Sequence, residues 1–144
     1  MWRNTLLVTI VVCATFPAQS EDDIRLKYGS PISETFAIHD GVGMTVRRGP
    51  NGRISEMLIA PIRGDSLVPS RSVTFPQELA LRILDEVVPK RKRGKFIIGG
   101  FANIICLPQN DCAGSYDNYE NVTISYNSAA EAGKLCYVNV RFKE

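Results

Sequence analysis

The sequence has little of what active sites and metal sites are usually made from. Histidine occurs once, at His39, and none of the four cysteines lies in a Cys-x-x-Cys spacing. A zinc site is not expected, because the spaced cysteine and histidine ligands of such sites are missing. The segment Gly41-Val42-Gly43 lacks the third glycine of a dinucleotide-binding loop, so it indicates a turn. We expect no cofactor and no metal.

Residues suited to acid–base catalysis are also scarce. The sequence nominates no nucleophile and no orienting acid for His39, so we interpret this residue as part of a turn. The carboxylate pairs Asp22-Asp23 and Asp85-Glu86 fit a helix start and a helix surface. We therefore favour a non-enzymatic protein. An enzyme whose site is assembled from scattered residues, such as His39, Asp40 and Glu56, stays open as an alternative.

No uncharged run is long enough to span a bilayer, which takes about twenty apolar residues. Residues 6–16 form a short apolar run, and Ala18 and Ser20 suit the two small positions of a signal peptidase site. We predict a cleaved signal peptide over residues 1–20, a periplasmic or extracellular location, and no transmembrane segment after cleavage. Two alternatives stay open: a lipoprotein acylated at Cys13, and an N-terminal membrane anchor that is not cut.

The mature chain, residues 21–144, carries sixteen basic and fifteen acidic residues, because only Arg3 is lost with the signal peptide. This near balance of charge points to no particular class of partner. Its length of about 124 residues is close to the usual size of one domain and is hard to divide into two. We predict a single domain.

Three cysteines remain after cleavage, an odd number in an oxidising compartment: Cys106, Cys112 and Cys136. Residues 135–142 alternate as a strand does, with Cys136 on the apolar face. We favour a Cys112–Cys136 disulfide, which would close a loop of about two dozen residues and stabilise the fold by about 3 kcal/mol. Pairing of Cys106 with either of the others stays open.

Turn residues divide the first half of the mature chain into short elements. Residues 22–31 begin with acids and end in Gly and Pro, which predicts a short helix. Asn51-Gly52 supplies the positive φ angles of a tight hairpin. A three-stranded antiparallel meander is expected, with strands at 35–38, 42–47 and 53–59. Residues 61–72, rich in Pro, Gly, Asp and Ser, are expected to form a loop.

The second half contains one amphipathic helix, predicted over residues 76–88 by its apolar periodicity and ended by Pro89. Further strands are expected at 96–107, 119–126 and 135–142. The first of these forms one strand, or two divided at Gly99-Gly100, and a polar loop is expected over Pro108–Asn118. We predict an α+β fold: an antiparallel sheet of five or six strands, two helices packed on it, and one disulfide.

One segment concentrates positive charge, with five cations in six positions: Lys90, Arg91, Lys92, Arg93 and Lys95. Such a cluster can bind a polyanion, for example lipid headgroups, nucleic acid or an acidic partner. The alternative is a solvated loop that complements the negative end of the preceding helix. In that case, replacing all five residues by Gln would change stability by less than about 1 kcal/mol. A dibasic processing site at Arg91–Arg93 also stays open.

Four segments are distinctive as a set: Leu26-Lys27-Tyr28-Gly29-x-Pro31, the hairpin from Val42 to Glu56-Met57, Val88-Pro89-Lys90-x-Lys92-Arg93-Gly94-Lys95, and Tyr119-Glu120-Asn121-Val122-x-Ile124. Together they resemble an uncharacterised family of exported bacterial proteins, over nearly all of the mature chain. The resemblance implies no activity, ligand or partner. Cys106 departs from the two-cysteine pattern of that family, which supports leaving it out of the predicted disulfide.

Residues 22–60 also resemble, more loosely, the opening of small outer-membrane-assembly lipoprotein domains, a resemblance that bears on the fold alone. We expect a non-enzymatic, monomeric or weakly self-associating protein that works by binding. Its partner is expected to be an anionic envelope component or another protein. A plain structural envelope protein and an enzyme are the open alternatives.

Overall fold

A computed structural model describes most of the chain after the predicted signal peptide. The described residues are Leu26, 33–70, 72–106 and 110–144. For residues 102–106 and 110–113 the description covers the backbone alone.

The chain divides into two units, Met1–Pro31 and Ile32–Glu144, and the fold described below belongs to the second. The predicted signal peptide lies outside the described residues. So does the helix predicted over residues 22–31, apart from Leu26.

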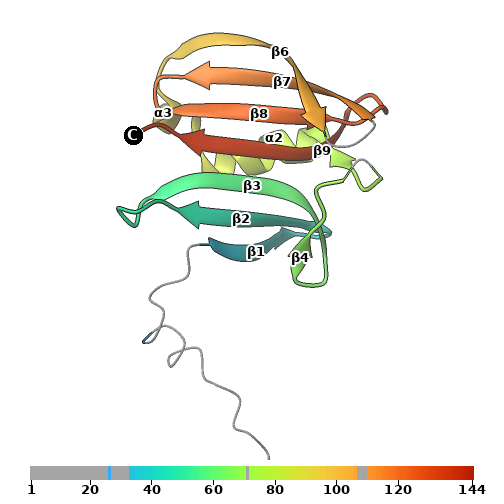
Figure 1. The fold of residues 1–144 in the computed structure, drawn as a ribbon, viewed down its shortest axis with the longest axis horizontal. Helices are drawn as coiled ribbons and strands as arrows, with labels where there is room; N and C mark the ends of the chain where they lie inside the picture. Colours follow the sequence, from blue (N-terminus) through green and yellow to red (C-terminus); the bar gives the residue numbers. More distant parts are fainter. Residues whose placement is uncertain (1–25, 27–32, 71, 107–109) are drawn as a thin grey trace, which may run out of the picture. The chain divides into compact units, whose positions relative to one another are not determined.

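The first three strands form the antiparallel meander that the sequence predicts (Figure 1). They are β1 (Ser33–His39), β2 (Val42–Arg48) and β3 (Ile54–Arg63). Gly52 has a φ of +74°, as the tight turn between β2 and β3 requires. Glycine at this turn therefore fixes the register of the hairpin.

The other elements are β4 (Ser66–Leu67), β5 (Phe75–Pro76), α2 (Gln77–Val87), α3 (Lys90–Arg93), β6 (Phe96–Cys106), β7 (Asn110–Tyr119), β8 (Val122–Ser128) and β9 (Lys134–Phe142). The strands form one sheet with the order β1-β2-β3-β9-β8-β7-β6, in which β4 pairs with β3 and β5 with β9. Every pairing is antiparallel. The last strand, β9, therefore lies inside the sheet, between β3 and β8.

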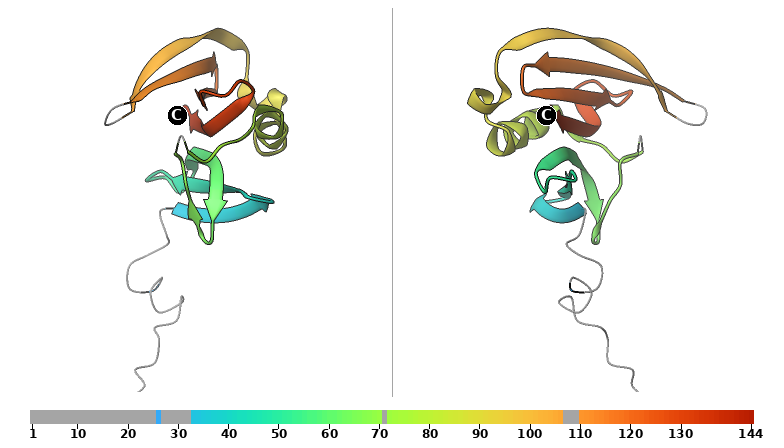
Figure 2. Two further views of the ribbon diagram at one scale, coloured as in Figure 1. Left: turned by 90° about the vertical axis from the view of Figure 1, so that its right-hand side faces the viewer. Right: turned by 60° about the vertical axis from the view of Figure 1, so that its left-hand side comes forward.

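The link from β3 to β6 runs through α2, which lies against one face of the sheet near β3 and β9 (Figures 1 and 2). Because of this crossover, β6 begins at the far edge, and β7, β8 and β9 return stepwise to β3. The end of the sheet where β6 begins, next to α3, therefore contains strand ends from both halves of the chain.

The hydrophobic core lies between α2 and the face of the sheet that it covers. The helix contributes Ala80, Ile83 and Leu84, each about 1% exposed. The sheet contributes Val42, Val46, Met57, Ile59, Val122, Ile124, Val138 and Val140. Complete burial of one such large side chain stabilises a fold by about 1.5–3 kcal/mol. The opposite face of the sheet is more polar, as the alternation of each strand requires.

The predicted fold class is wrong, because the described residues form a nine-stranded sheet with only two short helices. Part of the error lies in the loop expected at residues 61–72, which contains β4, in the unpredicted β5 after it, and in the loop expected at Pro108–Asn118. β4 and β5 are two-residue strands that pair along the margins of the larger strands. β7 is a long strand in spite of its polar sequence, because strand pairing is made by the backbone and β6 and β8 supply its hydrogen bonds.

The disulfide included in the predicted fold is also not found, since the described residues contain none. Cys136 is buried on β9, and the side chains of Cys106 and Cys112 are not described. Residue 112 belongs to β7, and β8 lies between β7 and β9. The pairing of Cys112 with Cys136 therefore stays a prediction, because the side chain of Cys112 is not described.

The described helices are short, and none of them is both long and apolar enough to cross a membrane.

Candidate functional site

The predicted basic cluster lies on a short helix, α3, and on the residues that follow it. α3 begins after Pro89, whose fixed φ suits a helix start. It ends at Gly94, which has a φ of +79° and a ψ of −167°. This combination is open to glycine almost alone, so the chain turns from α3 into β6 at this residue.

Arg93 points into the protein and is 4% exposed. Its Nε atom donates a hydrogen bond to the carbonyl oxygen of Val88 at 2.8 Å. Its Nη2 atom lies 2.5 Å from Oδ1 of Asp85, and its guanidinium carbon lies 6.0 Å from the centre of the Tyr119 ring. Arg93 therefore belongs to the fold and is not available to an external anion.

The turn between β7 and β8 holds the same segment from the other side. The Asn121 side chain donates from Nδ2 to the carbonyl oxygen of Lys92 at 3.0 Å, and its backbone N–H donates to the carbonyl oxygen of Arg93. Glu120 donates from its backbone N–H to the carbonyl oxygen of Lys95, and its Oε2 atom accepts from the Lys95 N–H at 2.9 Å. Four hydrogen bonds thus fix the backbone on both sides of Gly94.

The other four cations of the cluster, which we name the basic segment, are exposed: Lys90, Arg91, Lys92 and Lys95. None of their side chains forms an ion pair with any residue that the structure describes. The carboxylate of Glu120 accepts a hydrogen bond from the backbone N–H of Lys95 and forms no ion pair with these side chains. The basic segment therefore presents positive charge that the fold leaves unpaired.

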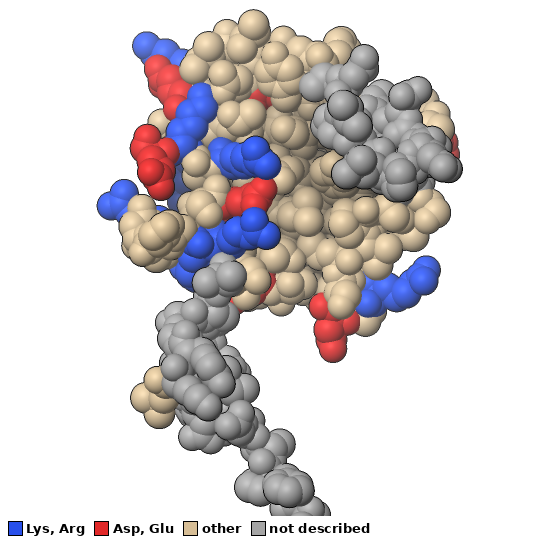
Figure 3. Space-filling view, in the orientation of Figure 1, with Lys and Arg blue, Asp and Glu red and all other residues tan. Residues whose placement is uncertain are grey.

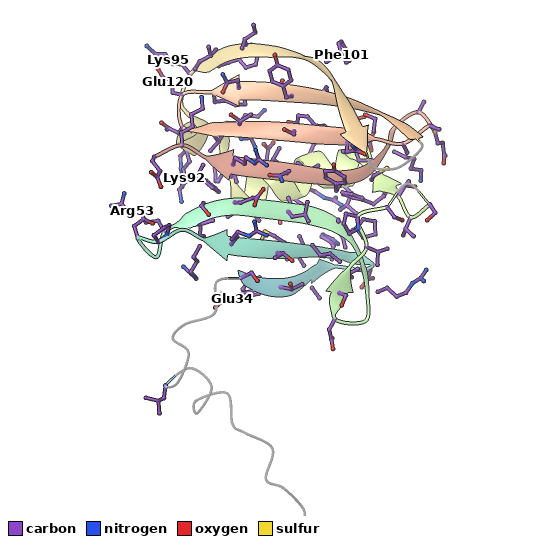
Figure 4. All side chains as sticks on the ribbon, viewed as in Figure 1. Glu34, Arg53, Lys92, Lys95, Phe101 and Glu120 are labelled. Carbon is purple, nitrogen blue, oxygen red and sulfur yellow. The ribbon has the colours of Figure 1, made fainter. Side chains whose placement is uncertain are left out.

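The topology adds further cations at this end of the sheet, where β2 and β9 end and β3, β6 and β8 begin. Lys143 donates from its backbone N–H to the carbonyl oxygen of Asn121 and from Nζ to that of Tyr119. Figure 3 shows basic side chains gathered toward this end with acidic ones among them, and Figure 4 labels Lys92, Lys95, Arg53 and Glu120 there. The charge asymmetry seen in the sequence thus becomes a basic end of the sheet.

A second charged group lies on the polar face of β2, β3 and β9, around Glu56. Its Oε1 atom accepts from Asn139 Nδ2 at 2.8 Å and from Arg141 Nε at 3.4 Å, and its Oε2 atom lies 3.3 Å from Arg47 Nη1. Glu56, Arg47 and Asn139 line a cavity of about 210 Å³ together with Thr45 and Leu58. The group holds one carboxylate and two guanidinium groups, and the buried Oδ1 atom of Asn139 has no hydrogen-bond partner in the described structure. Both arginines are already paired with Glu56, so no charged ligand is assigned to the cavity.

The pKa of Glu56 is held below its usual value of 4.5. The hydrogen bond from Asn139 is the main cause, and Arg141 and Arg47 act in the same direction against the effect of burial. A carboxylate with a lowered folded pKa stabilises the protein above its unfolded pKa and loses this contribution as the pH falls through the folded pKa.

Replacing Glu56 with Gln should therefore reduce stability by about 1 kcal/mol at neutral pH, since the two arginines are mostly exposed and the ion pairs are screened. The difference in the free energy of unfolding between the two proteins should shrink as the pH falls from about 6 to about 3. Urea titrations at several pH values would measure it. Glu131→Gln, at an exposed turn, is the control that should show little difference. A Glu56 difference that stays constant with pH would contradict the ionic role.

The residues of the alternative catalytic site are not brought together. His39 pairs with Val42, whereas Glu56 pairs with Arg47, five residues farther along β2. This places Glu56 roughly 17 Å from the end of the strand that holds His39 and Asp40. Among the described residues, no three His, Cys, Asp or Glu side chains form a group that could hold a metal ion.

Tyr126 also has a perturbed pKa. Burial raises the pKa of its hydroxyl, and the nearby charge of Asp117 raises it further. The hydroxyl donates a hydrogen bond to Asp117 Oδ2 at 3.3 Å. Tyr126 therefore stays protonated at neutral pH and serves as a hydrogen-bond donor.

No protein-family model matches this chain, and no curated protein matches it by sequence. Among solved structures, the chain is similar to the crystal structure of a DUF4309 family protein, YjgB, from Bacillus subtilis. The two are 13% identical, the TM-score is 0.38, and the match covers 90% of this chain and 82% of that one. The structural neighbour thus belongs to a family named as a domain of unknown function. A similarity of this size assigns this chain neither a family nor a function.

Sequence reasoning did not find the residues that hold the basic segment in place. Asp85 reaches Arg93 across the break at Pro89, and Glu120 and Asn121 come from a turn some thirty residues farther along the chain. The pairing of Asp85 with Arg93 could have been inferred from the sequence, since Asp85 lies on α2 shortly before the cations. Glu120 and Asn121 had none, because only the return of β7 to β8 places their turn beside α3.

Proposed function

We propose that this protein is exported and non-enzymatic, and that it binds an anionic envelope component through the basic segment. The observation that carries the proposal is that one of the five clustered cations is buried while the other four are exposed. Arg93 is buried and paired with Asp85, whereas Lys90, Arg91, Lys92 and Lys95 are exposed and have no acidic partner in the described structure. A predicted signal peptide over residues 1–20 supports the exported location.

A fixed backbone favours such binding. The hydrogen bonds from Glu120 and Asn121, together with the buried Arg93, hold the segment in one conformation, so less conformational entropy is lost on binding than for a flexible basic loop. Each Lys or Arg near an anionic membrane surface contributes about 1 kcal/mol. Four such residues give useful affinity only toward a surface that presents several negative charges close together.

The proposed ligand of the basic segment is a surface of closely spaced phosphate groups. In a cell envelope, the headgroups of anionic lipids form such a surface. The proposal is therefore tested with vesicles of phosphatidylglycerol and phosphatidylcholine, compared with vesicles of phosphatidylcholine alone. The purified protein should sediment with the anionic vesicles, and binding should weaken as the salt concentration rises.

The triple variant K90Q/R91Q/K92Q should bind anionic vesicles at least tenfold more weakly than the wild type. The matched control is R63Q/R82Q/K134Q, which removes the same amount of charge from outside the basic segment and should bind nearly as the wild type does. Equal losses in both variants would mean that net charge alone drives binding. That result, or equal binding to neutral vesicles, would contradict the proposal.

A further inference from the structure

One edge of the sheet is open, long and apolar. β6 pairs with β7 on one side, and no other strand of the described residues pairs with its second side (Figure 1). It runs for eleven residues, from Phe96 to Cys106. Along its first part, Phe96, Ile97 and Ile98 are each more than half exposed, and Phe101 is 94% exposed and extends beyond the ribbon in Figure 4.

The two edges of the sheet differ in how they are protected. Proteins usually guard an edge strand with charged residues, proline, or a short length, because the unpaired backbone groups invite another strand. β1, at the opposite edge, has seven residues, and Glu34 on it forms an ion pair with Arg48 at 3.6 Å. None of the eleven residues of β6 is charged, and none is proline. The β6 edge therefore lacks charge, proline and a short length, and it carries a register shift between Phe96 and Ile98.

We propose that β6 binds β6 of a second copy of this chain, antiparallel and about a two-fold axis, so that the sheet continues across the two molecules. The edge backbone groups of each strand would then be paired, and the exposed apolar side chains would be covered by their counterparts. This interaction is independent of the anion binding proposed above.

The distribution of charge favours a second copy in this orientation. The basic segment ends at Lys95, immediately before β6. Antiparallel pairing of two uncharged strands places the two basic segments at opposite ends, roughly 35 Å apart for eleven residues. That separation is several Debye lengths at physiological salt, about 8 Å each. A parallel arrangement would bring the two basic segments side by side, where they repel.

The glycines of β6 suit close approach of another backbone. A Cβ atom at Gly99 would lie 2.9 Å from Oδ1 of Asp117, and one at Gly100 would lie 3.1 Å from the Tyr116 hydroxyl. Side chains of β7 thus cover both glycines from above and below the sheet. The glycines themselves place no side chain beside the free edge, so a second strand can pair along it without obstruction.

The expected dimer is weak. A stable interface usually buries about 800 Å² on each partner, and pairing of single edge strands gives less. We expect a dissociation constant of about 10 μM, measured by sedimentation velocity of the purified protein over about 1–300 μM.

Phe101→Lys should weaken the dimer at least tenfold, because it places a positive charge at the apolar edge of both copies. Since Phe101 is almost fully exposed, this change should leave the monomer folded, which circular dichroism checks. Phe36→Lys is the matched control, an exposed phenylalanine on the opposite edge strand, and should leave the dimer unchanged. Ile98→Lys is a second test on β6 and should act as Phe101→Lys does.

A protein that stays monomeric to the highest concentration would overturn the proposal. So would a dimer that both β6 variants leave intact, and so would continued growth into larger polymers, which a closed two-fold pair excludes. The variant K90Q/R91Q/K92Q should dimerise as the wild type does, so loss of vesicle binding and loss of dimerisation are separate outcomes.

Discussion

Replacing Gly94 with alanine is expected to lower the free energy of unfolding by about 3 kcal/mol. Gly94 has a φ of +79° and a ψ of −167°, a backbone conformation that residues with a Cβ atom rarely adopt. Holding alanine there costs about 1–3 kcal/mol. The new methyl group would also lie 2.8 Å from Cβ of Glu120 and 3.2 Å from Nδ2 of Asn121. Strain and crowding therefore act together at this residue.

The crowding cannot be relieved by a change of rotamer alone. The closest atom is the Cβ of Glu120, which is fixed to the backbone of the β7–β8 turn rather than lying at the far end of a flexible side chain. To make room, the turn must move away from α3, and the hydrogen bonds from Glu120 and Asn121 to the segment would lengthen. The substitution should therefore weaken vesicle binding as well as stability.

Gly52→Ala is the matched control for Gly94→Ala in urea denaturation. Gly52 has a φ of +74°, but nothing lies within 4 Å of a Cβ atom built there. Its substitution should cost about 1 kcal/mol, from backbone strain alone. In a double-mutant cycle, Glu120→Gly removes the crowding atom and should recover about 1 kcal/mol or more of the Gly94→Ala loss. Equal costs at Gly52 and Gly94, with no coupling to Glu120, would show that the contact contributes nothing.

The local elements of this fold could be predicted where turn chemistry and periodicity agree. Asn51-Gly52 marks the β2–β3 hairpin, and the apolar repeat predicts residues 76–88 as a helix, which the structure has at Gln77–Val87. Both signals arise from neighbouring residues. The helix after Pro89 was missed, because four successive cations carry no apolar periodicity and α3 is held by Arg93 and Asn121 instead.

The long-range features of the fold had no comparable signal. β7 contains Asn110, Asp111, Asp117 and Asn118, residue types that favour turns, and it becomes a strand because two neighbours hydrogen-bond to its backbone. The pairing of β9 with β3 joins residues about eighty positions apart, such as Asn139 and Glu56. The basic cluster itself was found from composition, but its division into one buried and four exposed cations depends on this topology.

Arg93 gives the other large expected effect. The alternative interpretation of the cluster, a loop whose five cations are all solvated, is wrong for Arg93, which is 4% exposed. Arg93→Ala should lower the free energy of unfolding by about 3 kcal/mol. The carbonyl oxygen of Val88, a residue about 1% exposed, would lose its donor, and the buried stem of the side chain would lose its packing. Asp85 is half exposed and would regain water at little cost.

Two variants separate these contributions in urea denaturation. Arg93→Met keeps an apolar stem while it removes the hydrogen-bond donors, so it should cost about 2 kcal/mol. Lys92→Ala, at the preceding and exposed residue, should change stability by less than about 0.5 kcal/mol. Replacing all five cations by Gln should then cost about as much as Arg93→Gln alone, because the other four make no ion pair in the described structure. A loss spread evenly over the five positions would mean that the segment is held by its charge as a whole, and the exposed four would then be part of the fold rather than a surface for a ligand.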